Sequence, residues 1–244
     1  MKKTIKKPTF KEVVAVTTME LPDANLIFNS QRIGPMNFNG LRQADYGKGF
    51  RMPTMSELVP LVYASLENQD YKTAKEVIST LRNHWLTGDT GILYTQKGMY
   101  VQDKPKMENG RVSMNEKTLE ERLGSHEERG VVFSDDKNIR FTPYNYKRES
   151  QNALELSKNT GVIALTGSEE NAEKIARASG HYKIKPYFWT LFNVDSPQTR
   201  VAGLCSGYFD DGLYVDAYGS EDYGDRFSFG VLEKDTAGVA RKNK

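Results

Sequence analysis

Hydrophobic residues recur at helical spacing in two neighbouring segments of the first half of the chain. The first segment opens on a capping box at residues 54–57 (TMSE) directly after Pro53, and the second runs from about Asp70. Their apolar stripes consist of Leu58, Leu61, Val62 and Leu66, and of Ala74, Val77, Ile78, Leu81 and Trp85. Two adjacent helices are therefore predicted, and Pro60 lies early enough in the first to be tolerated.

Short runs of β-branched and aromatic residues predict strands at both ends of the chain and between its helices. Strands are predicted within 10–28, at 91–94 and 99–101 as a hairpin, and at 131–133, 139–141, 162–165, 187–191, 200–204 and 226–231. Loop is predicted at 30–49, a charged exposed stretch with a short helix near Leu119 at 103–128, and helices at 149–158 and after Ser168. Helices early and strands late indicate the α+β class.

No Gly/Ser-rich or Pro-rich linker and no internal repeat divides the 244 residues, so we expect a single domain over 1–244. Hydrophobic residues make up 38% and charged residues 27%, which is typical of a folded globular protein. No apolar run approaches the roughly 20 residues that span a bilayer, and we expect no membrane insertion. A net charge of only +2 gives no reason to expect a nucleic-acid partner, and we expect a monomer.

The basic start at residues 1–7 is interrupted by Pro8 before any apolar stretch, so no signal peptide is expected. A cytoplasmic or a virion-associated location would both fit. Cys205 is the single cysteine, which excludes an internal disulfide and a cysteine-rich zinc site. The fold must therefore be held together by its core.

Residues 195–225 differ in composition from the rest of the chain. Six Asp, four Tyr, three Ser and five Gly account for 18 of these 31 residues, and Asn is absent although it occurs 15 times elsewhere. Six Asp and Glu221 against Arg200 give the segment a net charge of −6. Tyr offers a large rigid contact area at little entropic cost, while Ser and Gly adapt, as in antibody paratopes.

Within this segment four polar or aromatic residues lie two positions apart: Tyr214, Asp216, Tyr218 and Ser220. In an extended strand they would share one outward face, and the apolar residues between them would pack inward. We interpret the outward face as a recognition surface. An acidic edge hairpin without any role is the alternative, because Tyr favours strands while Asp and Gly favour turns.

Two segments resemble the C-type lectin fold of formylglycine-generating-enzyme-like proteins. Residues 49–58 (GFRMPTMSEL) are similar to the G-[FW]-R-[LM]-P-T-x-x-E-[LW] motif at the start of a helix in that fold. Residues 188–190 and 226–231 resemble its late strands, so the likeness covers about 49–66 and 186–233. It implies a C-type lectin-like fold with a two-helix scaffold, mixed antiparallel sheets and a central insertion at about 95–180.

Within this group the chain resembles the variable proteins of diversity-generating retroelements, especially the archaeal variable protein. In that family template adenines are randomised, and an AAY codon for Asn becomes one for Tyr, Asp, Ser, Gly, Cys, Thr or His. The resemblance implies a variable region at about 190–233 that binds an unknown macromolecular ligand, with a protein as the favoured class. Its ligand-binding positions would be Asp195, Ser196, Thr199, Cys205, Gly207, Tyr208, Asp210, Asp211, Tyr214, Asp216, Tyr218, Ser220, Asp222, Tyr223 and Asp225. The invariant apolar scaffold beneath them would be Val201, Leu204, Leu213, Val215, Phe227 and Phe229.

The sequence offers little for catalysis, metal binding or a cofactor, and we expect none of them. The three histidines lie far apart, and a formylglycine-generating enzyme would need a pair of reactive cysteines. Asp pairs at 210–211 and at 222 and 225 match neither the EF-hand nor the Glu-Pro-Asn motif of sugar-binding lectins. Trp189 is assigned to the core rather than to a sugar-stacking surface. Two alternatives stay open: a catalytic relative that uses Cys205 or the Asp cluster, and a viral or cell-surface structural protein without a diversified site.

Overall fold

The computed structural model describes residues 8–13, 18–207 and 211–233; the basic segment 1–7 and the predicted site residues Tyr208 and Asp210 lie outside these ranges. The strands are β1 (Lys11–Val13), β2 (Thr18–Leu21), β3 (Leu26–Met36), β4 (Trp85–Tyr94), β5 (Gly98–Asp103), β6 (Lys106–Glu108), β7 (Arg111–Ser113), β8 (Leu123–Glu128), β9 (Val131–Ser134), β10 (Ile139–Pro143), β11 (Glu149–Ser150), β12 (Ile184–Trp189), β13 (Gln198–Ser206), β14 (Gly212–Gly219) and β15 (Arg226–Glu233). The helices are α1 (Phe38–Gln43), α2 (Met55–Glu67), α3 (Lys72–Asn83), α4 (Glu116–Arg122), α5 (Ala153–Ser157), α6 (Thr160–Thr166) and α7 (Glu169–Ala178), with 3-10 turns at Pro22–Ala24 and Ser179–His181.

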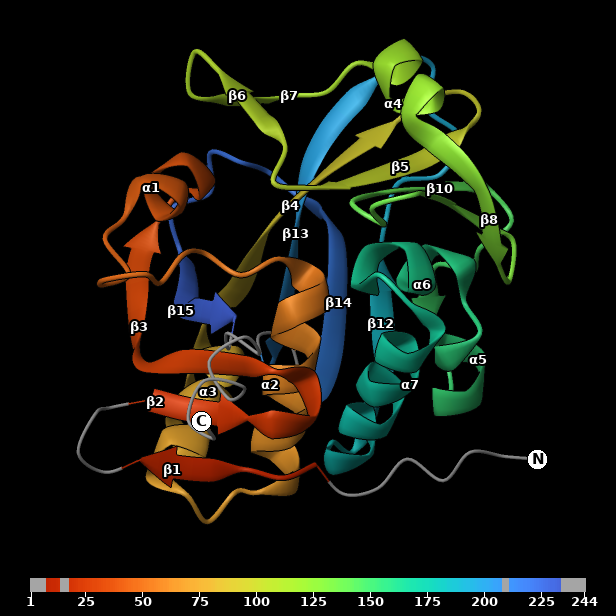
Figure 1. Ribbon diagram of the computed structural model, residues 1–244. Coiled ribbons are helices and arrows are strands. Elements are labelled where there is room, and N and C mark those ends of the chain that lie inside the picture. The colour runs from red at the N-terminus through yellow and green to blue at the C-terminus, as the bar shows by residue number, and fades with distance from the viewer. Residues whose placement is uncertain (1–7, 14–17, 208–210, 234–244) are drawn as a thin grey trace, which may run out of the picture.

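One large mixed sheet carries most of these strands, in the order β1-β2-β3-β15-β4-β13-β14-β12-β11 (Figure 1). Strands β5, β10, β9 and β8 extend it as an antiparallel branch that starts from β4. The last strand, β15, lies between β3 and β4, antiparallel to the first and parallel to the second. The predicted α+β class is confirmed, and the first three strands and the last strand lie in one sheet.

Helix α2 packs against both α3 and α7, and α2 and α3 also pack against this sheet (Figure 1). The predicted apolar stripe of α2 is buried, as are Ala74, Val77 and Leu81 of α3, so the two-helix scaffold is confirmed. Ser168 caps α7 by accepting a hydrogen bond from the backbone N–H of Asn171, as predicted. These helix faces share one core cluster with the inward residues of β13 and β14.

Several local predictions are wrong where distant contacts decide the structure; for example, the predicted helix at 149–158 begins with strand β11, and the predicted exposed stretch 103–128 also contains β6, β7 and β8. Residues 30–49 contain the second half of β3 and helix α1 rather than loop, since β3 pairs with β15 from the far end of the chain. Residues 162–165 belong to helix α6, which is buried on all sides, so its apolar run carries no periodicity. Trp85 begins β4 instead of extending the stripe of α3, which ends at Asn83.

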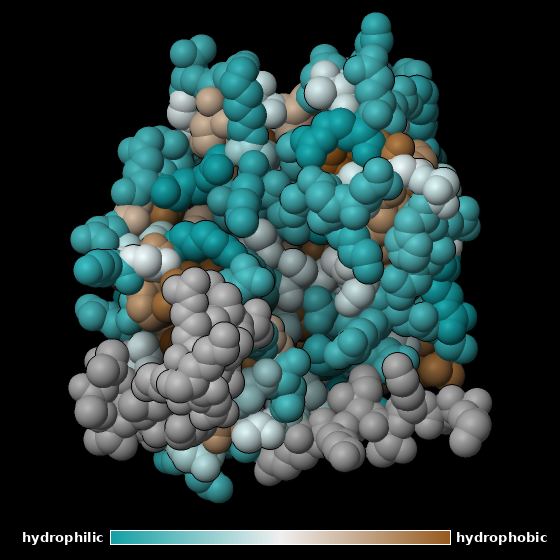
Figure 2. All heavy atoms as spheres, viewed as in Figure 1, coloured by the Kyte–Doolittle hydropathy of each residue, from teal (hydrophilic) through white to brown (hydrophobic). Residues whose placement is uncertain are grey.

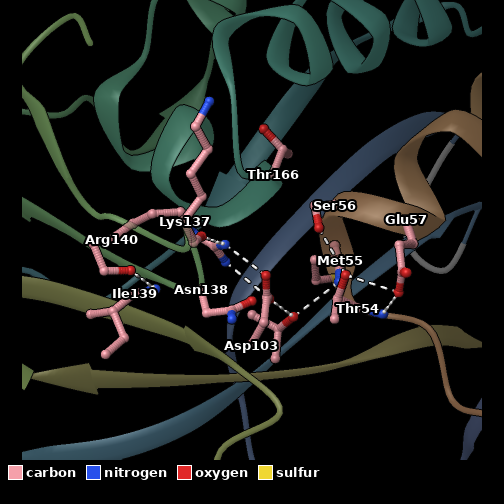
Figure 3. Close-up of polar contacts among 12 residues, drawn as sticks. Thr54, Met55, Ser56, Glu57, Asp103, Lys137, Asn138, Ile139, Arg140 and Thr166 are labelled. Atoms are coloured by element: carbon pink, nitrogen blue, oxygen red, sulfur yellow. Dashed lines mark hydrogen bonds and ion pairs between the residues drawn. The ribbon is translucent and has the colours of Figure 1, made fainter. Parts of the chain in front are cut away.

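The start of α2 is held by polar side chains of the GFRMPTMSEL segment (Figure 3). Arg51 donates two hydrogen bonds to the Glu57 carboxylate, at 2.8 and 2.6 Å. The backbone N–H of Thr54 donates to the same carboxylate at 2.8 Å. Arg51 and Val231 of β15 also exchange backbone hydrogen bonds. The motif therefore joins the helix start to the last strand.

A buried chain of hydrogen bonds continues from this helix start into the sheet (Figure 3). The Met55 N–H donates to the Thr90 hydroxyl at 2.9 Å, and that hydroxyl donates to Asp103 at 2.6 Å. Asp103 and Arg140 form a two-bond ion pair at 2.6 and 3.0 Å, with side chains only 5% and 1% exposed. The network links α2 with β4, β5 and β10.

The middle of the chain is integrated into the same core. Strands β5 and β10 pair within the main sheet, and α7 packs on α2. The division into a single domain with an insertion at about 95–180 stays a prediction. On the side seen in Figure 2, hydrophilic side chains cover most of the surface, and hydrophobic ones show mainly in recesses. Along the described residues, no helix is both long and apolar enough to cross a bilayer.

The buried ion pair predicts a large stability effect. Arg140→Ala would leave the Asp103 carboxylate buried without its counter-ion, and should lower the free energy of unfolding by about 3–5 kcal/mol. Arg122→Ala is the matched control, because it removes an exposed pair with Asp136 and should cost about 0–1 kcal/mol. Urea unfolding measures both, and equal losses would contradict the prediction.

Candidate ligand-binding cavity

The predicted site residues divide by exposure along β13, β14 and the adjoining loops. The exposed ones are Asp195, Ser196, Gly207, Asp211, Tyr218, Ser220, Asp222 and Tyr223, the partly buried ones are Thr199 and Asp225, and the buried ones are Cys205, Tyr214 and Asp216. The expectation that all of them project into solvent is therefore wrong for three positions. A ligand-binding role for the remaining residues stays a prediction.

Tyr214 and Asp216 are buried because the neighbouring strand covers them. Strand β14 lies inside the sheet, between β13 and β12. Tyr214 pairs in register with Tyr187 of β12, and Asp216 pairs with Trp189. The aromatic side chains of β12 therefore shield that face, which leaves the two residues only 6% and 5% exposed.

The opposite face of these strands matches the predicted apolar scaffold. The predicted inward residues of β14 are fully buried: Leu213, Val215 and Ala217. The other predicted scaffold residues are also buried: Val201, Leu204, Phe227 and Phe229. The alternation of inward and outward positions is thus correct, although the outward face is only partly open.

Cys205 lies in β13 and is 1% exposed. Burial, with a smaller contribution from the charge of Asp216, raises the pKa of its thiol far above the usual range. Because the thiolate is the reactive form, this environment disfavours a nucleophilic role for Cys205. The histidines are likewise separate: His84 contacts Asp225, and His181 contacts Glu67.

Beside the exposed end of β14 the surface is hollowed into a cavity of about 460 Å³. Five adjacent strands, β15, β4, β13, β14 and β12, contribute in turn Arg226, Trp85, Arg200, Asp216 and Trp189. The remaining lining residues follow Asp216 in the chain: Tyr218, Gly219, Ser220 and Tyr223. A hollow of this size suits a small molecule or an anchoring group of a larger partner.

Sequence reasoning found Asp216, Tyr218, Ser220 and Tyr223 in this cavity and missed the other side chains. Trp189 is half-buried and lines the cavity, so its assignment to the core is wrong. The unusual composition of 195–225 was the only signal in the sequence, and the two tryptophans lie outside that segment.

Aromatic rings and guanidinium groups alternate along the cavity wall. The Arg200 guanidinium carbon lies 5.2 Å from the centre of the Tyr218 ring, and that of Arg226 lies 5.9 Å from the centre of the Tyr223 ring. Such cation–π contacts favour a fixed orientation of the two rings. A second hollow of about 240 Å³ shares Trp189 and Tyr218 with the first.

Two buried charges of opposite sign line the cavity without touching each other. Burial raises the pKa of Asp216 to about 6, although the Tyr218 N–H, which donates to it at 2.7 Å, and the charge of Arg226 counteract this. Burial lowers the pKa of Arg226, and the charge of Asp216 counteracts it. A Cβ atom at Gly219 would lie 2.5 Å from Nη2 of Arg226 and 3.0 Å from Oδ2 of Asp216, so only glycine fits there.

The loop between β14 and β15 is anchored through its acidic residues. Glu221 accepts hydrogen bonds from the Val112 N–H at 2.7 Å and from Arg111 at 3.3 Å. Arg111 also pairs with Asp222 at 3.2 Å, and His84 lies 2.9 Å from Asp225. Across the described part of the chain, no three His, Cys, Asp or Glu side chains are grouped to hold a metal ion.

Comparisons with known proteins bear on the fold. No family model matches the chain, and no curated protein matches it. A solved structure described as "Accommodation of massive sequence variation in Nanoarchaeota by the C-type lectin fold" is similar, with a TM-score of 0.53 and 16% sequence identity. The match covers 82% of this chain and 96% of that chain. The protein therefore has the C-type lectin fold, as its GFRMPTMSEL segment predicted.

The tyrosines of β14 and the following loop differ in burial, so their replacement should change the stability of the protein by different amounts. Tyr214→Ala should lower the free energy of unfolding by about 3–5 kcal/mol, as for other buried aromatic residues. The double variant Tyr218→Ala/Tyr223→Ala should lower it by no more than about 1–2 kcal/mol, because these rings are exposed. Chemical unfolding compares them, and a larger loss in the double variant would refute the assignment.

Asp216 predicts a dependence of stability on pH. Its pKa of about 6 in the folded protein exceeds the ordinary value of 3.8, so the folded state binds more protons between these values. Stability therefore falls as pH rises through this range. Asp216→Asn removes that titration, and its free energy of unfolding should decline less steeply between pH about 4 and about 7 in urea unfolding. Parallel plots of unfolding free energy against pH for the two proteins would contradict the prediction. Burial also raises the pKa of Asp89 to about 6, but Asp89 is present in both proteins, so its contribution cancels when the slopes are compared.

Proposed function

We propose that this protein is a non-enzymatic ligand-binding protein, whose C-terminal surface is diversified by a retroelement and binds a macromolecular partner, with a protein as the favoured class. The observation that carries the proposal is the position of Tyr218 and Tyr223. They are 47% and 40% exposed, and both border the 460 Å³ cavity. Large aromatic side chains at the edge of a concave site are the anchors on which protein interfaces depend most.

The division between surface and scaffold supports the same proposal. Exposed side chains of β14 and its loop can change with little effect on the fold, because the inward residues beneath them are fully buried. The loop keeps its position through Glu221, which accepts hydrogen bonds from the β6–β7 hairpin and is not among the predicted variable positions. The similar protein from Nanoarchaeota is described as accommodating massive sequence variation on this fold.

Diversification makes a prediction about the gene. In copies of the gene from related genomes, substitutions should concentrate at the exposed predicted positions such as Tyr218, Ser220, Asp222 and Tyr223. Their codons should end in a pyrimidine, and a near-repeat with adenines at the corresponding sites should lie beside a reverse transcriptase gene. Sequencing the locus in several isolates measures this directly.

Exposed positions outside 190–233 serve as the control, since they are equally accessible but not predicted to vary. Substitutions spread evenly over both groups would contradict diversification, and would favour a structural protein without a variable site.

A further inference from the structure

Two arginine side chains, Arg200 and Arg226, line the cavity. Each guanidinium group carries five N–H donors. Arg226 donates to one hydroxyl and one backbone carbonyl, and Arg200 donates to one backbone carbonyl and one side-chain amide. Neither guanidinium forms an ion pair with a carboxylate among the described residues. Arg226 is only 1% exposed and its Nε is buried without a partner there, so it places a buried positive charge behind the cavity wall. Arg200 is partly exposed, and its unused N–H donors are the ones that can face a ligand.

The acidic residues near the cavity do not offset these charges. Glu221 and Asp222 are bonded to Arg111, and Asp225 lies against His84, so the loop acids are already paired. Asp216 is the one carboxylate in the lining, and it makes no direct contact with either guanidinium. The cavity thus carries two cations against one anion, although the surrounding segment is acidic.

The apolar part of the lining consists of flat rings. Trp85 and Trp189 are the two tryptophans of the chain, and both line this cavity, on strands β4 and β12. Indole rings offer large planar surfaces for stacking. A ligand that matches this cavity therefore combines a flat apolar body with a group that accepts several hydrogen bonds.

We propose that the cavity binds a carboxylate carried on an aromatic body, with Arg200 donating to the carboxylate, the buried charge of Arg226 behind it, and Trp85 and Trp189 facing the ring. The inference rests on the proposed function and names the ligand chemistry of that site. An aromatic residue at the carboxyl end of a polypeptide and a free aromatic acid share this chemistry. All four residues lie outside the predicted variable positions, so the preference belongs to the part of the lining that is not predicted to vary.

Intrinsic tryptophan fluorescence reports on the cavity, because both tryptophans line it. The protein is titrated with N-acetylphenylalanine and with the primary amide of the same compound. The acid should bind more tightly than the amide by at least about tenfold, the size expected from one charge-assisted hydrogen bond. Equal affinity for the two compounds, or no response to either, overturns the inference.

The variant Arg200→Gln tests whether the carboxylate is recognised in the cavity. Arg200 is partly exposed, and circular dichroism verifies that the variant is folded. Its preference for the acid should fall to about threefold or less, because the charge-assisted bond is lost. The control Arg122→Gln removes an exposed arginine that does not line the cavity, and it should keep the full preference. An unchanged preference in Arg200→Gln overturns the assignment.

A short peptide that ends in phenylalanine distinguishes the two sources. Tighter binding of the peptide than of N-acetylphenylalanine supports a polypeptide end as the ligand, and equal binding supports a free aromatic acid. Failure of these titrations would leave the gene-level test of diversification unaffected. An evenly substituted gene, in turn, would leave a measured preference for the acid standing.

Discussion

Strand β15 is bonded to three parts of the protein at once. It pairs antiparallel with β3, lies parallel to β4, and exchanges backbone hydrogen bonds with Arg51 at the start of α2. In the β4 pairing Arg226 stands opposite Trp85, which brings a residue from the end of the chain beside one from its first half. Because β15 lies between β3 and β4 and supplies Arg226, the pairing of the last strand also completes the lining of the cavity.

The polar network behind α2 makes that arrangement rigid. Arg51 and Glu57 hold the helix start to β15, while Thr90, Asp103 and Arg140 hold it to the other strands of the sheet. A buried ion pair gives little net stability compared with apolar packing, but it penalises every arrangement that separates its members. The network therefore specifies where the helix lies on the sheet more than it strengthens the fold.

The sequence predicts features that depend on neighbouring residues, but it does not predict features that depend on the register of distant strands. The capping box at the start of α2 and the alternation of buried residues in β14 were readable because their partners lie a few residues away. The burial of Asp216 and the partial exposure of Trp189 differ from the prediction because they depend on the pairing of β12 with β14, which no spacing in the chain reveals. The sequence does not indicate that Arg226 and Trp85 line the cavity, because they become neighbours only through the pairing of β15 with β4. The composition of 195–225 indicates the right region but does not show that three other strands, β4, β12 and β15, complete the site.

Gly219 sets a limit on how this surface can evolve. Its neighbours Tyr218 and Ser220 are exposed, yet any side chain at 219 would collide with Arg226 and with the backbone oxygen of Val201, 2.8 Å from the added atom. Under the proposed diversification, substitutions at this codon would be selected against. The variable surface would then consist of two separate tracts, the end of β14 and the loop beyond it, with a constant glycine between them.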